Sequence, residues 1–253
     1  MIVKILGSGT SGGVPMIGCN CEVCLSNDPR DKRLRTSVLL QINNKNFVFD
    51  AGPDFRQQML REKVDTLEAI IFTHPHRDHT AGLDDVRAYN HFQQKAMDIY
   101  VTAETENSLR KEYHYVFNDV WYPGLPKINF CQITNSPFNI GEISFTPIEV
   151  MHYKMQVFGY RVGDFTYITD ANYISEEEKN KILGSKVLIL NALRKEKHIS
   201  HYNLEEALQL IAELKPEKAY LTHLSHQMGK HVDIEKELPA NVFIAFDGLA
   251  IEL

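Results

Sequence analysis

Short apolar runs separated by turn residues recur along the chain and predict a protein rich in β-strands. Residues 69–72, Ala-Ile-Ile-Phe, form a run typical of a buried strand. Residues 36–49 predict a hairpin around Asn43-Asn44-Lys45, because apolar runs flank residues that favour a tight turn. Residues 157–169 predict a second hairpin around Gly163-Asp164 for the same reason.

A helical stretch follows each of the predicted hairpins. Residues 54–61 fill this position in the first half, and the acidic residues 175–183 fill it in the second. A further helix is predicted over residues 203–214, where Asn203 precedes a run rich in Leu, Glu and Ala. The sequence therefore indicates an α/β (α+β) protein with two loosely similar β-rich halves and outer helices.

The composition is typical of one enzyme domain outside the membrane. With 253 residues, of which 43% are hydrophobic, the chain can bury a large core, and we predict a single domain over residues 1–253. No apolar stretch approaches the ~20 residues that cross a bilayer. The formal net charge of −6 disfavours stable nucleic-acid binding. We interpret the basic run of Arg30, Lys32, Arg33 and Arg35 as a solvated loop, and we expect a cytoplasmic protein because no targeting segment is recognised.

The most informative motif lies directly after a predicted strand. Residues 73–79 read Thr-His-Pro-His-Arg-Asp-His, which places His74, His76, Asp78 and His79 in one short loop. Imidazole and carboxylate are ligands that Zn²⁺, Mn²⁺ and Fe²⁺ share. Because histidine is scarce and the spacing is specific, the motif favours a metal site over a solvated His-rich loop.

The H-x-H-x-D-H spacing resembles that of metallo-β-lactamase-fold hydrolases. The resemblance implies a four-layer αββα sandwich, the fold shared with ribonuclease Z, with the metals at the edge of the sheets. It also implies three further ligands at the ends of later strands: a His, an Asp and a His. The residues at the corresponding positions are His152, Asp170 and His223.

The same resemblance implies two metal ions that act together. One ion would be held by His74, His76 and His152, the other by Asp78, His79 and His223, and Asp170 would bridge them. A shared carboxylate and a shared hydroxide offset the repulsion between two cations, and the hydroxide would be the nucleophile. Asp78 is also expected to be catalytic by orienting that hydroxide. The ligand types suit Zn²⁺ and Mn²⁺ equally, so both remain candidates.

A second cluster consists of thiols. Cys19, Cys21 and Cys24 lie within six residues, and the chain has four cysteines in all. With no signal peptide recognised, disulfide chemistry is disfavoured. Three thiolates need one more ligand for a tetrahedral structural zinc site, and the resembled subfamily supplies it from the position of His226. Such a site would fasten the amino-terminal loop to the wall of the catalytic site beside His223.

The thiol motif, the histidine motif and residues 82–87, Gly-Leu-Asp-Asp-Val-Arg, together resemble the subgroup of phosphoribosyl cyclic phosphate phosphodiesterases. The resemblance implies a phosphodiesterase that acts on a small phosphodiester, cyclic ones included. A tRNA 3′-processing endonuclease is one alternative, although the sequence shows no separate glycine-rich and basic arm for gripping tRNA. A thioester or lactone hydrolase and a noncatalytic metal-binding accessory protein of a biosynthetic pathway are the others.

Phosphodiester cleavage also needs a group that stabilises charge on the phosphoryl oxygens or assists the leaving oxygen. His201 lies just before the predicted helix of residues 203–214, where the phosphodiesterase and tRNA-processing branches carry such a catalytic His. His198 is the nearby rival, and His201 could also be an ordinary neighbour of a helix start. Asn191 stands where Asp is usual in the resembled proteins, so no role is transferred to it.

Three other features are assigned no catalytic role. Residues 7–12, Gly-Ser-Gly-Thr-Ser-Gly, match a dinucleotide-binding pattern, but the glycines and proline of residues 13–18 exclude the helix that must follow. The aromatic residues 113–123 fit a flap over the substrate, a homodimer contact or core packing. Cys131, far from the other thiols, is interpreted as a buried core residue.

Overall fold

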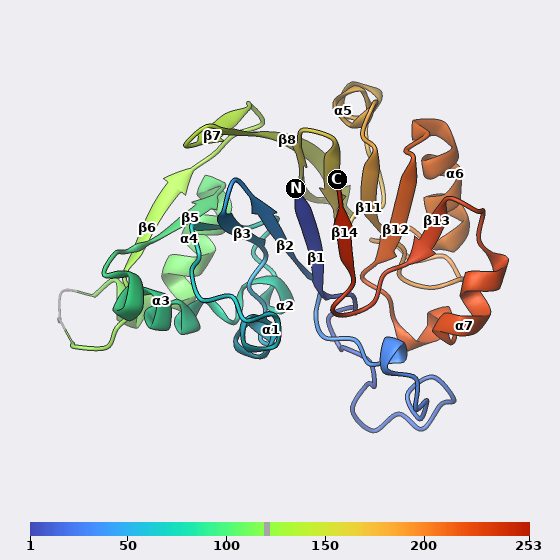
Figure 1. The fold of residues 1–253 in the computed structure, drawn as a ribbon, viewed down its shortest axis with the longest axis horizontal. Coiled ribbons are helices and arrows are strands. Elements are labelled where there is room, and N and C mark those ends of the chain that lie inside the picture. Colours follow the sequence, from blue (N-terminus) through green and yellow to red (C-terminus); the bar gives the residue numbers. More distant parts are fainter. Residues whose placement is uncertain (119–121) are drawn as a thin grey trace.

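Two facing β-sheets of seven strands each form the centre of the protein (Figure 1). The computed structural model describes residues 1–118 and 122–253. The first sheet has the order β14 (Ala250–Glu252), β1 (Ile2–Gly7), β2 (Ser37–Ile42), β3 (Lys45–Phe49), β4 (Ala69–Ile71), β5 (Met97–Val101) and β6 (Ile128–Gln132). The second has the order β13 (Val242–Ile244), β12 (Lys218–Thr222), β11 (Val187–Asn191), β10 (Phe165–Ile168), β9 (Met155–Val162), β8 (Ile143–His152) and β7 (Phe138–Ile140).

Helices cover the outer face of each sheet (Figure 1). The first sheet carries α1 (Phe55–Glu62), α3 (Val86–Gln93) and α4 (Ala103–Glu112), with the short α2 (Arg77–Thr80) in the loop beyond β4. The second carries α5 (Glu176–Ile182), α6 (Leu204–Leu214) and the short α7 (His231–Ile234). Single 3₁₀ turns span Pro29–Asp31, Leu83–Asp85, His114–Val116, His226–Met228 and Glu235–Glu237. The predicted four-layer αββα sandwich is confirmed.

Alternation along single strands explains the layers. In β2, Val38 and Leu40 pack between the two sheets, whereas Leu39 points outward and packs with Phe55 and Met59 of α1. Successive side chains of a strand point to opposite faces, so a strand that is apolar on both faces is buried between a sheet and a helix layer.

Tyrosines of the central layer connect the core to the loop that carries the histidine motif. The hydroxyl of Tyr160 donates a hydrogen bond to the carbonyl of Phe72 at 2.7 Å. The Phe49 ring stacks on Tyr160 with the ring centroids 5.5 Å apart. The loop after β4 therefore begins on a rigid support, which fixes where its side chains point.

Both predicted hairpins are present. β2 and β3 pair antiparallel, and the connecting Asn43 and Asn44 have φ values of 51° and 59°. Asparagine tolerates this left-handed conformation, which a two-residue hairpin of type I′ requires. β9 and β10 pair antiparallel around Gly163, whose φ is 58°.

Two sequence interpretations are wrong. Arg33 is not solvated but 5% exposed, because its guanidinium donates to the hydroxyl of Ser8 at 2.9 Å and to the carbonyl of Ala245. Buried acceptors thus replace the water that a surface arginine would keep. Cys131 is half-buried rather than part of the core, because it lies on β6, the edge strand of the first sheet.

The aromatic segment of residues 113–123 is only partly described, since residues 119–121 lie outside the described residues. Tyr113 is buried and its hydroxyl donates to the carbonyl of Thr80 at 2.9 Å. Tyr115 is 39% exposed and donates to Asp84. Core packing therefore accounts for Tyr113, while the flap and the homodimer contact remain predictions.

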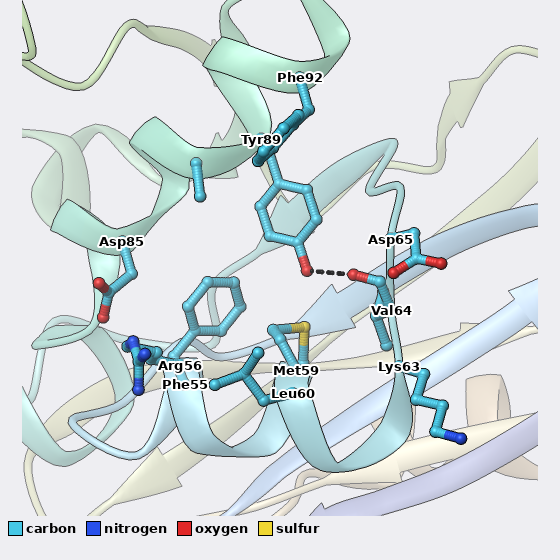
Figure 2. A pocket seen from close by; sticks show the side chains of 11 residues that line it. Phe55, Arg56, Met59, Leu60, Lys63, Val64, Asp65, Asp85, Tyr89 and Phe92 are labelled. Atoms are coloured by element: carbon cyan, nitrogen blue, oxygen red, sulfur yellow. Dashed lines mark hydrogen bonds between the residues drawn. The ribbon is translucent and has the colours of Figure 1, made fainter.

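A groove of about 800 Å³ lies between α1 and α3, on the outer face of the first sheet (Figure 2). Its walls are largely apolar and include Phe55, Met59, Leu60, Tyr89 and Phe92. None of the residues of the histidine motif line it, so this hollow is separate from the candidate chemistry. Across the described ranges, every helix is too short or too polar to traverse a bilayer.

Candidate metal centre

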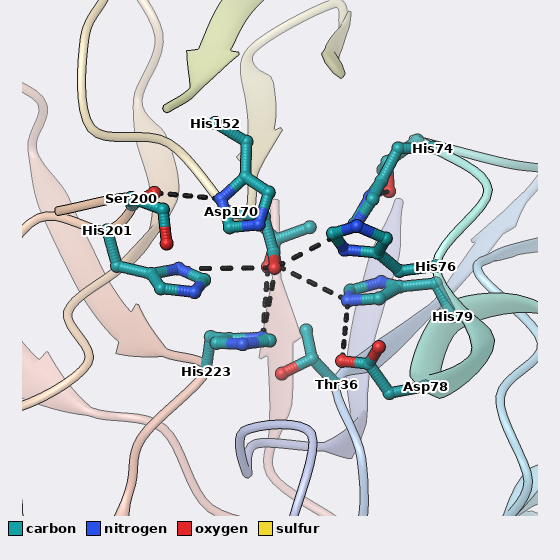
Figure 3. A network of polar contacts seen from close by, with 12 residues as sticks. Thr36, His74, His76, Asp78, His79, His152, Asp170, Ser200, His201 and His223 are labelled. Atoms are coloured by element: carbon teal, nitrogen blue, oxygen red, sulfur yellow. Dashed lines mark hydrogen bonds and ion pairs between the residues drawn. The ribbon is translucent and has the colours of Figure 1, made fainter. Parts of the chain in front are cut away.

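The ends of four strands bring the candidate ligands together on one side of the sandwich (Figure 3). β4 leads into the loop with the histidine motif, β8 ends at His152, β10 is followed by Asp170 and β12 by His223. Within each sheet these β4, β10 and β12 strands run parallel to a neighbour, and parallel strands present their carboxyl ends at a common edge. Residues far apart in the sequence therefore converge.

Asp170 is the centre of this arrangement. Its carboxylate is 2% exposed and lies 3.1 Å from Nδ1 of His223 and 3.3 Å from Nε2 of His79. Nε2 of His74 lies 3.8 Å away and Nδ1 of His201 lies 3.9 Å away. The hydroxyl of Thr169 donates to the same carboxylate at 2.6 Å. Several imidazoles thus converge on one buried carboxylate.

The potential ligand atoms fall into groups that share Asp170. In each group the ligand atoms lie within 4.8 Å of one another. The groups are Asp78, His79, Asp170 and His223; His74, His76 and Asp170; and His152, Asp170 and His201. His152 is not in the 4.8 Å group of His74 and His76, but its ring centroid is 5.2 Å from that of His76. All the residues that the sequence analysis selected for the metal pair therefore meet here, and their roles as ligands remain predictions.

Outer hydrogen bonds fix the orientation of the imidazoles. Asp50 lies 2.8 Å from Nδ1 of His79, and the carbonyl of Ser200 lies 2.8 Å from Nδ1 of His152. Nδ1 of His74 lies 2.9 Å from the hydroxyl of Thr73. Nε2 of His79 and Nε2 of His74 are buried and have no hydrogen-bond partner among the residues that the structure describes. A metal-binding imidazole commonly donates its other ring nitrogen to a carboxylate or carbonyl. The donor set therefore fits divalent metal ions.

The negative charge of the cluster is also suited to bound cations. Burial opposes protonation of His79, but the carboxylates of Asp170, Asp50 and Asp78 outweigh it and raise the pKa of His79 well above its usual range. Burial likewise opposes ionisation of Asp170, yet the imidazoles of His223 and His79 hold its pKa well below the ordinary value. Three carboxylates thus face His79, and bound dications would balance their negative charge.

The backbone is strained where the ligands leave their strands. Asp170 has a φ of 55° and His223 a φ of 57°, a conformation that is rare for residues other than glycine. Asp50, at the end of β3, has a φ of 63°. Such strain persists only where surrounding contacts impose it, and it collects at functional sites.

Two glycines let the chain approach α2 closely. A Cβ atom on Gly52 would lie 2.0 Å from the carbonyl oxygen of Asp78. A Cβ atom on Gly82 would lie 2.2 Å from the carbonyl oxygen of Gly52. Both positions therefore require glycine, and they explain why Asp78 and His79 can sit at the start of a short helix against the end of β3.

The thiol cluster forms a second candidate site. Cys19, Cys21, Cys24 and His226 place their ligand atoms within 4.8 Å of one another. Nδ1 of His226 lies 3.3 Å from the sulfur atoms of both Cys19 and Cys21. The backbone N–H of Cys24 and the imidazole of His226 lower the pKa of Cys21 to about 6, whereas burial raises the pKa of Cys24 to about 11. The four groups fit a closed tetrahedral zinc site, and all three thiols are free of disulfides.

A comparison with models of protein families identifies the family of this chain. Residues 45–224, more than half of the chain, match the family model described as the beta-lactamase superfamily domain. The chain belongs to the beta-lactamase superfamily. The resemblance to metallo-β-lactamase-fold hydrolases that the histidine motif indicated is thereby confirmed.

Two solved structures refine the placement of this beta-lactamase superfamily member. A structure described as a new diphosphatase from the PhnP family is 36% identical in sequence and covers 100% of this chain and 97% of its own, with a TM-score of 0.94. At that identity and coverage the chain also belongs to the PhnP family. Zn²⁺-bound PqqB from Methylobacterium extorquens is 20% identical, covers 100% of both chains and has a TM-score of 0.78, which shows a common fold.

Curated relatives of this superfamily member carry other names. The octanoyltransferase of Porphyromonas gingivalis is 37% identical over 248 residues, which are 97% of this chain and 50% of that protein. Coenzyme PQQ synthesis protein B of Acinetobacter baylyi is 28% identical over 169 residues, which are 60% of this chain and 54% of that protein. The chain spans about half the length of these curated relatives.

The structure distinguishes the two candidate histidines beside the cluster. His201 is 7% exposed, its Nδ1 has no hydrogen-bond partner within residues 1–118 and 122–253, and burial lowers its pKa to about 3. His198 is further out, and its Nδ1 accepts a hydrogen bond from the backbone N–H of Ser200 at 3.3 Å. Of these two histidines, His201 alone belongs to a group of potential ligands around Asp170 in the described part of the chain.

Sequence reasoning missed one residue of the centre. Asp50 is fully buried and contacts both His79 and the hydroxyl of Thr73, the latter at 3.0 Å. Its one sequence signal is its position directly after the predicted strand of residues 46–49, which resembles the position of Asp170 after the predicted strand of residues 165–169. That signal becomes informative only once β3 is known to lie beside β4.

Proposed function

We propose that the protein is a dinuclear-metal phosphodiesterase that hydrolyses a small phosphodiester, with cyclic phosphodiesters included. The observation that carries the proposal is the sharing of Asp170 among three groups of potential ligands, one of which contains His201, whose Nδ1 is buried and has no hydrogen-bond partner among the described residues. When bound, two divalent ions acidify water and polarise phosphoryl oxygens. The ligands suit zinc and manganese alike.

The residues of the centre divide into holding and orienting roles. As the family resemblance implies, His74, His76 and His152 would hold one ion, Asp78, His79 and His223 the other, and Asp170 would be common to both sets. The geometry supports the second set with Asp170, and His74 and His76 with Asp170, while the ligand atom of His152 lies close to those of Asp170 and His201. Asp78 is less enclosed than Asp170, with its side chain 16% exposed, and lies 3.2 Å from Nε2 of His79. It is therefore able to accept a hydrogen bond from the attacking water and orient it.

His201 acts on the substrate. Because its imidazole is buried and neutral, it can donate one hydrogen bond to a phosphoryl or leaving oxygen without repelling the metals. Its Nδ1 lies 3.9 Å from Asp170, so His201 would be placed to donate to a substrate oxygen held beside that carboxylate. A phosphate that carries charge on several oxygens gains more from such a donor than a neutral carbonyl does.

The thiol site has a structural role in this proposal. Cys19, Cys21 and Cys24 fasten the amino-terminal loop to His226, three residues beyond His223. A zinc ion with four protein ligands has no open position for substrate. The proposed complement is therefore two catalytic ions and one structural zinc.

Replacement of His201 by alanine is expected to lower kcat for a phosphodiester by about 100-fold, because one charge-stabilising donor is lost. Zinc content should be unchanged. Steady-state kinetics and metal analysis of the purified variant measure both. His198→Ala is the matched control and should retain the kcat of the parent.

The His201 assignment fails if kcat is unchanged, or if His198→Ala is the more damaging substitution. Loss of one zinc ion per chain in His201→Ala would instead make His201 a ligand. Each of these outcomes is visible in the same pair of measurements.

Support for a phosphorus substrate comes from the PhnP-family diphosphatase, which is 36% identical to this chain. A diphosphate and a phosphodiester pose the same problem, since both need a nucleophile at phosphorus and a stabilised leaving oxygen. Diphosphates are therefore the first additional substrates to test.

A second candidate is hydrolysis of an acyl thioester. It is favoured by the name octanoyltransferase on a relative 37% identical to this chain, although the chain covers 50% of that protein. The same metal pair could direct water to a carbonyl carbon. Hydrolysis of an octanoyl thioester faster than any phosphodiester or diphosphate would favour this function over the first.

A further inference from the structure

Tyr153 has a backbone conformation that is unfavourable for its bulky side chain. It lies in the two-residue turn that joins β8 to β9, directly after His152, and its φ is 58°. Glycine and asparagine tolerate this left-handed region, whereas a large aromatic residue is strained in it. Tyrosine at this position therefore lowers the stability of the fold.

The other residues with such a conformation each have a local reason for it. Among the described residues other than glycine, three end helices: Lys63, Gln94 and Lys215. Three more belong to the candidate metal centre: Asp50, Asp170 and His223. The remaining two form the first hairpin turn, where asparagine is tolerated: Asn43 and Asn44. Tyr153 shares a turn position with these asparagines but not their tolerance of it, so the fold alone does not explain this residue.

The ring of Tyr153 adds little to the packing of the protein. The residue is 50% exposed. Its backbone N–H is hydrogen-bonded, whereas its hydroxyl has no such partner within the described ranges. The ammonium of Lys154 lies 5.3 Å from the ring centroid. An exposed aromatic side chain in a strained turn beside a candidate metal centre indicates contact with a ligand.

The side chain of Asn172 connects this turn to the segment that carries His201. Its Oδ1 accepts a hydrogen bond from the N–H of Tyr153 at 2.8 Å, and its Nδ2 donates to the carbonyl of Ile199 at 3.2 Å. Ile199 is two residues before His201, and it is 66% exposed. The ring centroids of His201 and His152 are 4.6 Å apart. Tyr153 and Ile199 therefore border the side of the centre on which His201 lies, and both expose apolar surface there.

We propose that Tyr153 is a specificity-determining residue whose ring stacks on a nucleobase in the leaving group of the substrate. The proposal rests on the proposed function in one respect, namely that the phosphoryl group is held at the metal pair. A leaving oxygen that faces His201 directs the group attached to it toward Tyr153 and Ile199. Every nucleobase presents an aromatic face, and stacking on an aromatic side chain strengthens its binding. The positive charge of Lys154 beside the ring favours an anionic ligand, so a nucleoside phosphate fits better than an uncharged aromatic compound.

Substitutions in this turn separate recognition from folding. Tyr153→Gly removes the ring and relieves the strained conformation, so its melting temperature should equal that of the parent or exceed it by about 2 °C. Tyr153→Phe keeps the ring and loses only the hydroxyl. The matched control is Tyr173→Ala, because Tyr173 is 58% exposed and follows Asp170 by three residues. Tyr173 lines a small hollow that contains none of the potential metal ligands of the described chain.

The test is isothermal titration calorimetry of the zinc-loaded full chain with adenosine 5′-monophosphate and with ribose 5-phosphate. The two probes share a sugar phosphate, and only the first has a base. The parent and Tyr153→Phe should bind the nucleotide about 10-fold more tightly than the sugar phosphate, and Tyr153→Gly should reduce this preference to about twofold or less. Tyr173→Ala should keep the preference of the parent. Thermal unfolding of each variant measures its stability.

Equal affinity of the parent for the two probes overturns the proposal. So does a preference that persists in Tyr153→Gly, or one that Tyr173→Ala loses to the same extent. Neither probe has to be hydrolysed, so failure of the proposed function is seen separately. A parent protein that prefers the nucleotide but leaves phosphodiesters intact would refute the hydrolysis and support Tyr153 as the residue that recognises the base.

Discussion

Asp170→Asn should reduce phosphodiester hydrolysis by at least about 1000-fold, a loss of about 4 kcal/mol in transition-state stabilisation. The substitution keeps the shape of the side chain and removes its charge. In the parent, four imidazoles surround this carboxylate, and both proposed metal groups depend on it. Without the charge, two adjacent dications would have no shared anionic ligand from the protein to offset their repulsion.

The matched control is Asp164→Asn, at the other end of β10. Asp164 is 47% exposed and pairs with Lys186 on the surface. This variant should keep both activity and metal content. A metal-loaded Asp170→Asn protein with more than a tenth of the parent's kcat would contradict the assignment of Asp170 as the shared ligand.

Cys21→Ser should release one zinc ion and lower the melting temperature by about 10 °C. Structural zinc sites contribute directly to folding, and a loss of about 3 to 5 kcal/mol in the free energy of unfolding corresponds to a shift of about this size in a protein of this length. The thiol of Cys21 is suited to metal binding because its pKa is lowered to about 6. Zinc analysis and thermal unfolding followed by circular dichroism measure the two effects.

Cys131→Ser is the matched control for the thiol site. Its sulfur lies on the edge strand β6 and belongs to none of the potential ligand groups among the described residues. It should retain all zinc and melt close to the parent. Equal melting temperatures for Cys21→Ser and Cys131→Ser, with equal zinc content, would remove the case for a structural zinc ion.

Local features of the fold and the positions of the candidate ligands could be predicted from the sequence, whereas long-range strand pairing could not. Hairpins are local, so Asn43 and Asn44 between apolar runs were enough to predict the pairing of β2 with β3. The pairing of β1 with β14 joins residues such as Ile2 and Glu252, and no local pattern indicates it. The candidate ligands could be located because the resembled motif places them in loops after strands, and the order of the strands brings them together; their roles as ligands remain predictions.

Residues whose role depends on one distant contact could not be predicted. Asp50 is 29 residues from His79, and by itself it is an acidic residue before a turn. Arg33 lies in a basic run that resembles solvated sequence, yet its guanidinium reaches Ala245, 212 residues away. In both cases the deciding quantity is a buried partner for a polar group, which sequence patterns of hydrophobicity do not contain.

The central claim is tested most directly by hydrolysis of a chromogenic phosphodiester by the purified protein, reconstituted separately with Zn²⁺ and with Mn²⁺. The account predicts turnover with at least one of the two metals, and a loss of about 100-fold or more in Asp78→Ala, which lacks the carboxylate that orients the attacking water. Protein that is shown to be metal-loaded and yet leaves both the phosphodiester and a diphosphate intact would contradict the account.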